Sequence, residues 1–63
     1  MTNDERLWWI SHDLSIARVN AAINKILAEN PNVDETMLQE SMVKMYFESF
    51  HSFRNRVPRD RLD

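Results

Sequence analysis

Apolar residues recur at the three- and four-residue spacing of amphipathic helices in two long segments of this chain, separated by Asn30-Pro31-Asn32. Neither segment contains glycine or proline, so nothing interrupts a first helix over about residues 3–29. Pro31 disfavours helical geometry at the residue before it, and Pro58 ends the second pattern. The spacing therefore predicts a second helix over about residues 33–56.

Capping patterns support both helix starts. Thr2 is followed three residues later by Glu5, the spacing of a capping box, and either Asn32 or Asp34 can cap the second helix. The connection is only about five residues long, which favours antiparallel neighbours. We therefore predict an all-α fold: one antiparallel two-helix hairpin over residues 1–57, followed by a flexible basic tail at residues 58–63.

The first helix carries two apolar stripes when its residues are placed at about 100° each. The first stripe contains Trp8, Trp9, Ile16, Val19, Ile23, Ile26 and Leu27, with His12 among them. Most of its members alternate by three and four, which predicts a coiled-coil-like seam through Trp9, His12, Ile16, Val19, Ile23 and Ile26. The second stripe contains Leu7, Ile10, Leu14, Ala17 and Ala21, and a polar strip with Ser11, Ser15 and Arg18 flanks it.

The second helix has one broad apolar face, and together the two helices carry more apolar surface than a lone hairpin can cover. The face contains Leu38, Met42, Val43, Met45, Tyr46, Phe47, Phe50 and Phe53. Exposing a large apolar side chain instead of burying it forfeits about 1.5–3 kcal/mol. A chain of 63 residues without cysteine has no disulfide to compensate. We expect either a homodimer that forms a four-helix bundle or a complex with another protein.

The surplus surface also predicts where a partner protein binds. Of Trp8 and Trp9, one is expected in the core and the other, Trp8, at the contact surface, since neighbouring helical residues diverge. The predicted protein-binding residues are Leu7, Trp8, Ile10, Leu14, Ala17, Ala21, Phe47 and Phe50. Met42 and Met45 are interpreted as core filling, and Met37 as exposed.

Composition narrows the class of protein. Hydrophobic residues make up 43% of the chain, which is too many for a disordered protein, and a net charge of −2 gives no overall attraction to nucleic acid. The polar start does not resemble a signal peptide, no apolar run is long enough for a bilayer, and the absence of cysteine fits a reducing compartment. We expect a cytoplasmic protein.

Two short motifs resemble catalytic or metal sites. Ser11-His12-Asp13 has the residues of a hydrolase triad, but consecutive helical side chains point about 100° apart and cannot form its hydrogen-bond chain. Glu48 and His51 have the Glu-x-x-His spacing of di-iron bundles, yet both fall on the polar side of the second helix. We interpret them as a solvated pair, and we expect no enzyme activity, cofactor or metal.

Basic residues suggest the alternative of nucleic-acid binding. They lie on the first helix and in the tail: Arg18, Lys25, Arg54, Arg56, Arg59 and Arg61. The tail charge is diluted by Asp60 and Asp63, and basic residues in a last helical turn also complement the helix dipole.

In its length, its opening Met1-Thr2, its short central turn and its polar tail, the chain resembles the Rop family of plasmid RNA-binding proteins. That resemblance implies a dimeric four-helix bundle and RNA contacts along the first helix, where this chain has Ile10 and Leu14 beside Arg18 and Lys25. The main expectation remains a small regulator, inhibitor or adaptor, of the kind that phages and mobile elements encode, acting by helix-face docking.

Overall fold

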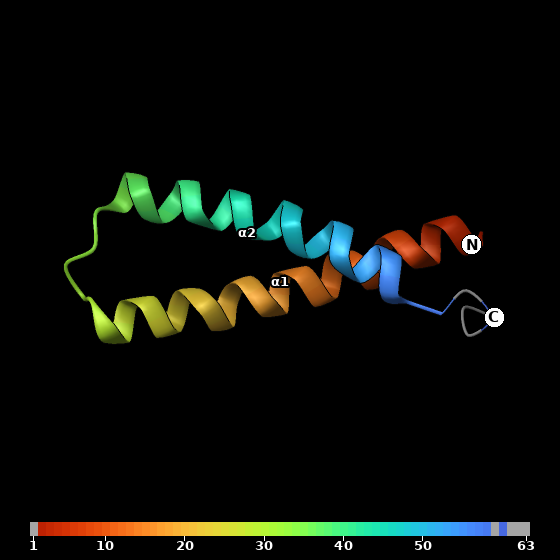
Figure 1. The fold of residues 1–63 in the computed structure, drawn as a ribbon, viewed down its shortest axis with the longest axis horizontal. Coiled ribbons are helices and arrows are strands. Elements are labelled where there is room, and N and C mark those ends of the chain that lie inside the picture. The colour runs from red at the N-terminus through yellow and green to blue at the C-terminus, as the bar shows by residue number, and fades with distance from the viewer. Residues whose placement is uncertain (1, 59, 61–63) are drawn as a thin grey trace.

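The chain folds as an antiparallel hairpin of two long helices (Figure 1). A computed structural model describes residues 2–58 and 60, which include α1 (Asn3–Glu29) and α2 (Glu35–Arg56). The hairpin is a rod with extents of 44 × 17 × 17 Å, and the start of α1 and the end of α2 lie together at its open end (Figure 1). The prediction of an all-α helical hairpin is confirmed.

Each helix begins at a side-chain cap. The Thr2 hydroxyl Oγ1 accepts a hydrogen bond of 3.1 Å from the Glu5 backbone N–H, so the first cap lies where the sequence places it. At the second helix, Asp34 Oδ1 accepts from the Met37 N–H at 3.1 Å. Asp34 is therefore the cap, and α2 begins at Glu35, two residues later than expected. These bonds satisfy backbone donors that the first helical turn leaves without partners.

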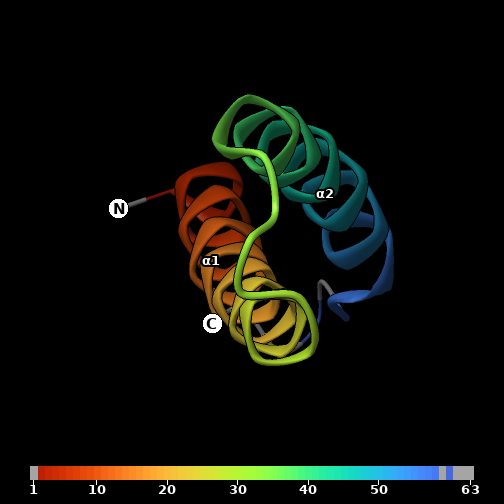
Figure 2. The same cartoon turned by 90° about the vertical axis from the view of Figure 1, so that its left-hand side faces the viewer.

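The turn between the helices is short because Pro31 stops α1 abruptly. Asn30 has φ −143° and ψ 78°, outside the helical region, although its N–H still donates to the Ile26 carbonyl at 2.8 Å. The Val33 N–H then donates to the Asn30 carbonyl at 3.1 Å, which closes the turn. Seen end-on, the connection steps directly from one helix to the other (Figure 2).

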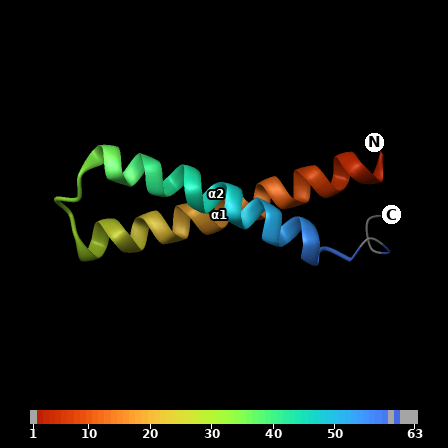
Figure 3. The same cartoon turned by 45° about the horizontal axis from the view of Figure 1, so that its top comes forward.

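The helices pack along a row of every fourth residue, which differs from the predicted seam. The buried residues of α1 are Leu7, Ser11, Ser15, Val19 and Ile23. Such a row is inclined to the helix axis, so helices that pack along it cross, as α1 and α2 do in Figure 3. Trp9 and Ile16, which the coiled-coil-like seam placed in the core, are 51% and 42% exposed. Of that seam, Val19 and Ile23 are buried, and His12 contacts α2 from the edge of the core.

Serine explains the difference. Ser11, Ser15 and Ser49 are all buried, and Ser49 is the only buried residue among those described in α2. Their small side chains let the two backbones approach, whereas Trp9 or Ile16 at the crossing would hold the helices apart. Ser15 Oγ donates to the Ser11 carbonyl at 2.6 Å, so its own helix satisfies the hydroxyl. The two serines of the polar strip that flanks the second stripe are therefore part of the core, whereas Arg18 of the same strip is exposed.

The apolar core is small as a consequence. It consists of Leu7, Val19 and Ile23, supported by half-buried residues of α2 such as Met42 and Met45. Leu7 was expected on the free second stripe, but it is 2% exposed and belongs to the core. Neither α1 nor α2 combines the length and hydropathy that crossing a bilayer requires.

Candidate apolar docking surface

Large apolar side chains stand at the surface of both helices. Those that are at least 38% exposed are Trp8, Trp9, Ile10, Leu14, Ile16, Leu27, Met37, Val43 and Phe47. The exposure of Met37 agrees with its interpretation from the sequence. Isolated exposed apolar residues are normal on proteins, but neighbouring ones mark contact surfaces. A contact surface is therefore indicated where several of these exposed side chains are neighbours.

One group is an aromatic cluster that joins the two helices near the open end. We define it as Trp8, Trp9, His12, Tyr46, Phe47 and Phe50. Trp8 stacks on His12 with ring centroids 5.0 Å apart and meets the edge of Phe50 at 5.9 Å. On α2, Tyr46 lies 5.4 Å from Phe47 and 6.0 Å from Phe50. These centroid distances are those of favourable aromatic pairs.

A hydrogen bond fixes the centre of the aromatic cluster. His12 Nδ1 and the Tyr46 hydroxyl are 2.7 Å apart, and both side chains are half-buried. The Tyr46 hydroxyl can donate to Nδ1 when that nitrogen carries no hydrogen, and it can accept from Nδ1–H in the other tautomer, so both tautomers of His12 keep the contact. The bond holds both rings at the edge of the core and fixes the surface on which Trp8 stacks.

The two tryptophans differ from their expected roles. One was expected in the core, but Trp8 and Trp9 are 44% and 51% exposed. Trp8, the expected contact residue, packs against Phe50 of α2, while Trp9 meets the edges of Trp8 and His12. The reason is that Leu7 and Ser11 occupy the crossing, which turns both indoles to the flank of the hairpin. Both tryptophans therefore contribute to the exposed surface.

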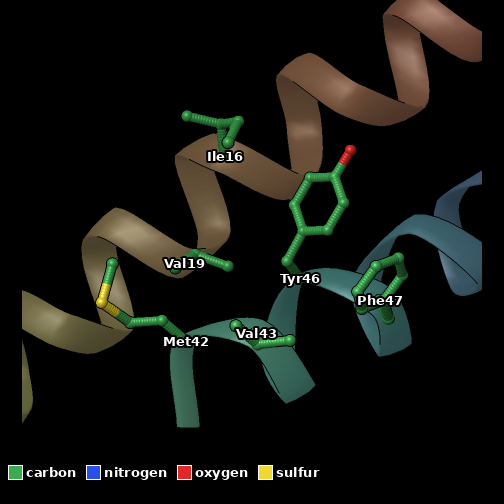
Figure 4. A pocket seen from close by; sticks show the side chains of 6 residues that line it. All are labelled: Ile16, Val19, Met42, Val43, Tyr46 and Phe47. Atoms are coloured by element: carbon green, nitrogen blue, oxygen red, sulfur yellow. The ribbon is translucent and has the colours of Figure 1, made fainter. Parts of the chain in front are cut away.

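Beside the aromatic cluster lies an apolar hollow with a volume of about 240 Å³ (Figure 4). Six side chains from both helices line it: Ile16, Val19, Met42, Val43, Tyr46 and Phe47. Tyr46 and Phe47 belong to both features, so the hollow and the aromatic cluster form one continuous surface. Val43 and Phe47 are each 57% exposed.

Sequence reasoning identified part of this surface. It named Trp8, Phe47 and Phe50 as contact residues, but it assigned Ile16 to the hairpin seam and did not single out Val43. Their periodicity matches that of core residues, and no local signal separates the two roles. The sequence indicated an exposed apolar surface only through its number of apolar residues, which is larger than the core of a hairpin can hold.

The second stripe, without Leu7, forms another exposed surface. Ile10 and Leu14 are exposed, as are Ala17 and Ala21. Leu14 and Ile16 are two residues apart, and two steps of about 100° place them on opposite sides of α1. The hairpin therefore presents apolar side chains on two sides, the hollow on one and the Ile10–Leu14 stripe on the other.

The basic residues of α1 lie beside the second stripe and not beside the hollow, because Arg18 follows Leu14 by four residues and Lys25 follows Ala21 by four. Arg18 and Lys25 are exposed and seven residues apart, hence on one side of α1, with Lys25 near the turn. Arg54 and Arg56 are exposed in the last turn of α2, at the opposite end of the hairpin, where they complement the helix dipole. Arg59 and Arg61 lie outside the described residues. Among the residues that are described, the basic side chains form no continuous stripe.

Glu48 and His51 are exposed on α2, and the rings of His51 and Phe50 meet edge to face with centroids 6.4 Å apart. Within residues 2–58 and 60, no three histidine or carboxylate side chains come together as a metal site would require. Comparisons with models of protein families, with curated proteins and with solved structures gave no match.

Proposed function

We propose that this chain is a small, non-enzymatic interaction protein of the cytoplasm, a regulator, inhibitor or adaptor that acts by docking its helix faces on other helices. Two hairpins associate as a homodimeric four-helix bundle, and the remaining apolar surface binds another protein. The observation that supports this proposal is the imbalance of the hairpin: among the described residues, three large apolar side chains are buried, and nine are at least 38% exposed.

The energetics favour association. Fully burying a large apolar side chain that was fully exposed gains about 1.5–3 kcal/mol. The side chains here are about half exposed, so a partner that covers three of them gains roughly half of that for each, about 2–5 kcal/mol in total. Exposed residues at helical spacing, such as Ile10 and Leu14, suit docking into a groove between a partner's helices. This mode of binding requires no catalytic step, because a hairpin that occupies a surface of its partner prevents other proteins from binding there.

Protein binding is favoured over nucleic-acid binding by where the charges lie. Nucleic-acid affinity comes mainly from basic groups that follow the phosphate backbone. Here Arg18 lies near the middle of α1 and Lys25 nearer the turn, whereas Arg54 and Arg56 lie in the last turn of α2 at the open end. The apolar side chains, in contrast, are continuous from Trp8 to Val43. A Rop-like contact to RNA would show itself as affinity that falls steeply with salt.

A capture experiment with paired variants tests the proposal. The full chain is immobilised and offered an extract of its source cells, alongside Trp8→Ala, Leu14→Ala and, as a control for an exposed polar site, Lys25→Ala. We expect proteins retained by the wild type and by Lys25→Ala to be lost by at least one apolar variant. Circular dichroism checks that each variant stays helical. Folded apolar variants that retain the same proteins as the wild type would refute docking through these faces, and loss with Lys25→Ala alone would favour nucleic acid.

A further inference from the structure

We propose that the apolar hollow is filled by Phe47 of a second copy of this chain, while Phe47 of the first copy enters the hollow of the second. The two hairpins then pair about a two-fold axis that passes beside α2. This inference rests on the proposed function and deepens it, because it names the face that self-association uses and the side chain that fills it.

The apolar hollow and the exposed Phe47 at its edge are the two features that such a contact requires. Phe47 is 57% exposed at the edge of a hollow of about 240 Å³, so one face presents a large apolar side chain and a concavity side by side. A two-fold axis repeats each contact, so a face with both features is complementary to itself. Insertion of a side chain between residues of two facing helices is also the way four-helix bundles pack.

The surface area of the chain agrees with a missing partner. Its accessible surface is 5039 Å², whereas a compact monomer of 7.6 kDa has about 4,300 Å². The excess of about 700 Å² is close to the roughly 800 Å² that each partner contributes to a stable interface of standard size. One long side of the 44 × 17 Å rod has about that footprint.

The shape of the chain supports the same conclusion. Its radius of gyration is 14.1 Å, against about 10.6 Å for a compact domain of 63 residues. A compact protein of twice the length has about 13.8 Å by the same relation. The hairpin is therefore already as long as a compact dimer, and a second rod laid alongside it thickens the particle more than it lengthens it.

The other apolar side stays free in this arrangement. Leu14 points to the side of α1 opposite Ile16, so a copy seated on the hollow leaves Ile10 and Leu14 uncovered. Self-association and binding of a different protein then use different faces of the same hairpin. Leu14 is also a matched control for Phe47, because both are exposed apolar residues of the wild type.

Sedimentation equilibrium of the full chain tests the inference, with Phe47→Asp and Leu14→Asp measured beside the wild type. We expect the wild type to approach twice its 7.6 kDa mass, the dimer of Phe47→Asp to dissociate at a concentration at least about tenfold higher, and Leu14→Asp to match the wild type. Phe47 is exposed in the hairpin, so a variant that loses the dimer and stays helical supports the assignment. A wild-type chain that remains a monomer overturns it.

A cross-linking measurement covers the case in which Phe47→Asp fails to fold. The chain has no cysteine, so Val43→Cys and Leu14→Cys each introduce a single thiol on opposite sides. A short bis-maleimide should link Val43→Cys into a covalent dimer and leave Leu14→Cys largely uncross-linked. Cross-linking only through Leu14→Cys, or a dimer indifferent to Phe47→Asp, overturns this inference while the proposed function stands. A chain that cross-links through Val43→Cys and dimerises through Phe47 but captures no other protein has the reverse meaning, because it supports this inference and counts against the binding of another protein.

Discussion

At the scale of single residues, three serines determine how this hairpin packs. Ser11 and Ser15 are buried where α1 crosses α2, and Ser49 is buried on the opposite helix. A helical serine can donate its hydroxyl to the carbonyl four residues earlier, as Ser15 does to Ser11, and so enter a core without a partner from the other helix. Their small volume at the crossing is what displaces Trp9 and Ile16 to the surface.

Substitutions at two of these serines should therefore have opposite consequences. Ser11 Oγ is buried and has no hydrogen-bond partner among the described residues, so Ser11→Ala should be neutral or stabilising within about 1 kcal/mol. Ser15→Leu adds volume at the crossing and should lower the free energy of unfolding by about 1–3 kcal/mol. Urea unfolding followed by circular dichroism at one fixed protein concentration measures both. Equal stability of Ser15→Leu and the wild type would contradict the close approach of the helices.

At the scale of the elements, the sequence determines where the helices begin and end better than how they pack. Pro31 and Pro58 act on the residues next to them, and a cap such as Thr2 acts within one helical turn, so both effects can be read locally. Packing depends on which face of α1 meets α2. Ile16 and Val43 have the periodicity of core residues, and only the crossing along the serine row assigns them to the surface.

The start of α2 offers a test of this local control. The sequence allows Asn32 or Asp34 as the cap, and the bond from the Met37 N–H selects Asp34. Asp34→Ala should cost about 0.5–2 kcal/mol of stability, since it removes both the acceptor and a negative charge at the positive end of the helix dipole. Asn32→Ala is the matched control and should change stability by less than about 0.5 kcal/mol. Thermal unfolding of both variants at equal concentration measures the two changes in stability. A larger loss of stability for Asn32→Ala than for Asp34→Ala would contradict Asp34 as the cap of α2.

At the scale of the whole molecule, the hairpin is a thin rod whose two helices cannot enclose their own apolar residues. Within residues 2–58 and 60, three large side chains form the buried apolar core, and a rod 17 Å thick has no interior position for the other large apolar residues. Small domains commonly compensate for a weak core by oligomerising. In the proposed dimer, the contacts between the two hairpins would also stabilise their helices, so the free energy of unfolding would depend on association.

This link predicts that the thermal midpoint depends on protein concentration. A dimer that forms only from folded chains gains about 1.4 kcal/mol for each tenfold rise in concentration, or about 0.7 kcal/mol per chain. For a domain of about 60 residues, that corresponds to an increase of roughly 3–5 °C in Tm. Circular dichroism melts over a hundredfold concentration range should show the trend for the wild type and for Leu14→Asp, and a much flatter one for Phe47→Asp. A cooperative wild-type transition whose Tm does not change with protein concentration would contradict the dimer, and would leave the exposed apolar residues of the hairpin as a binding surface for a different protein.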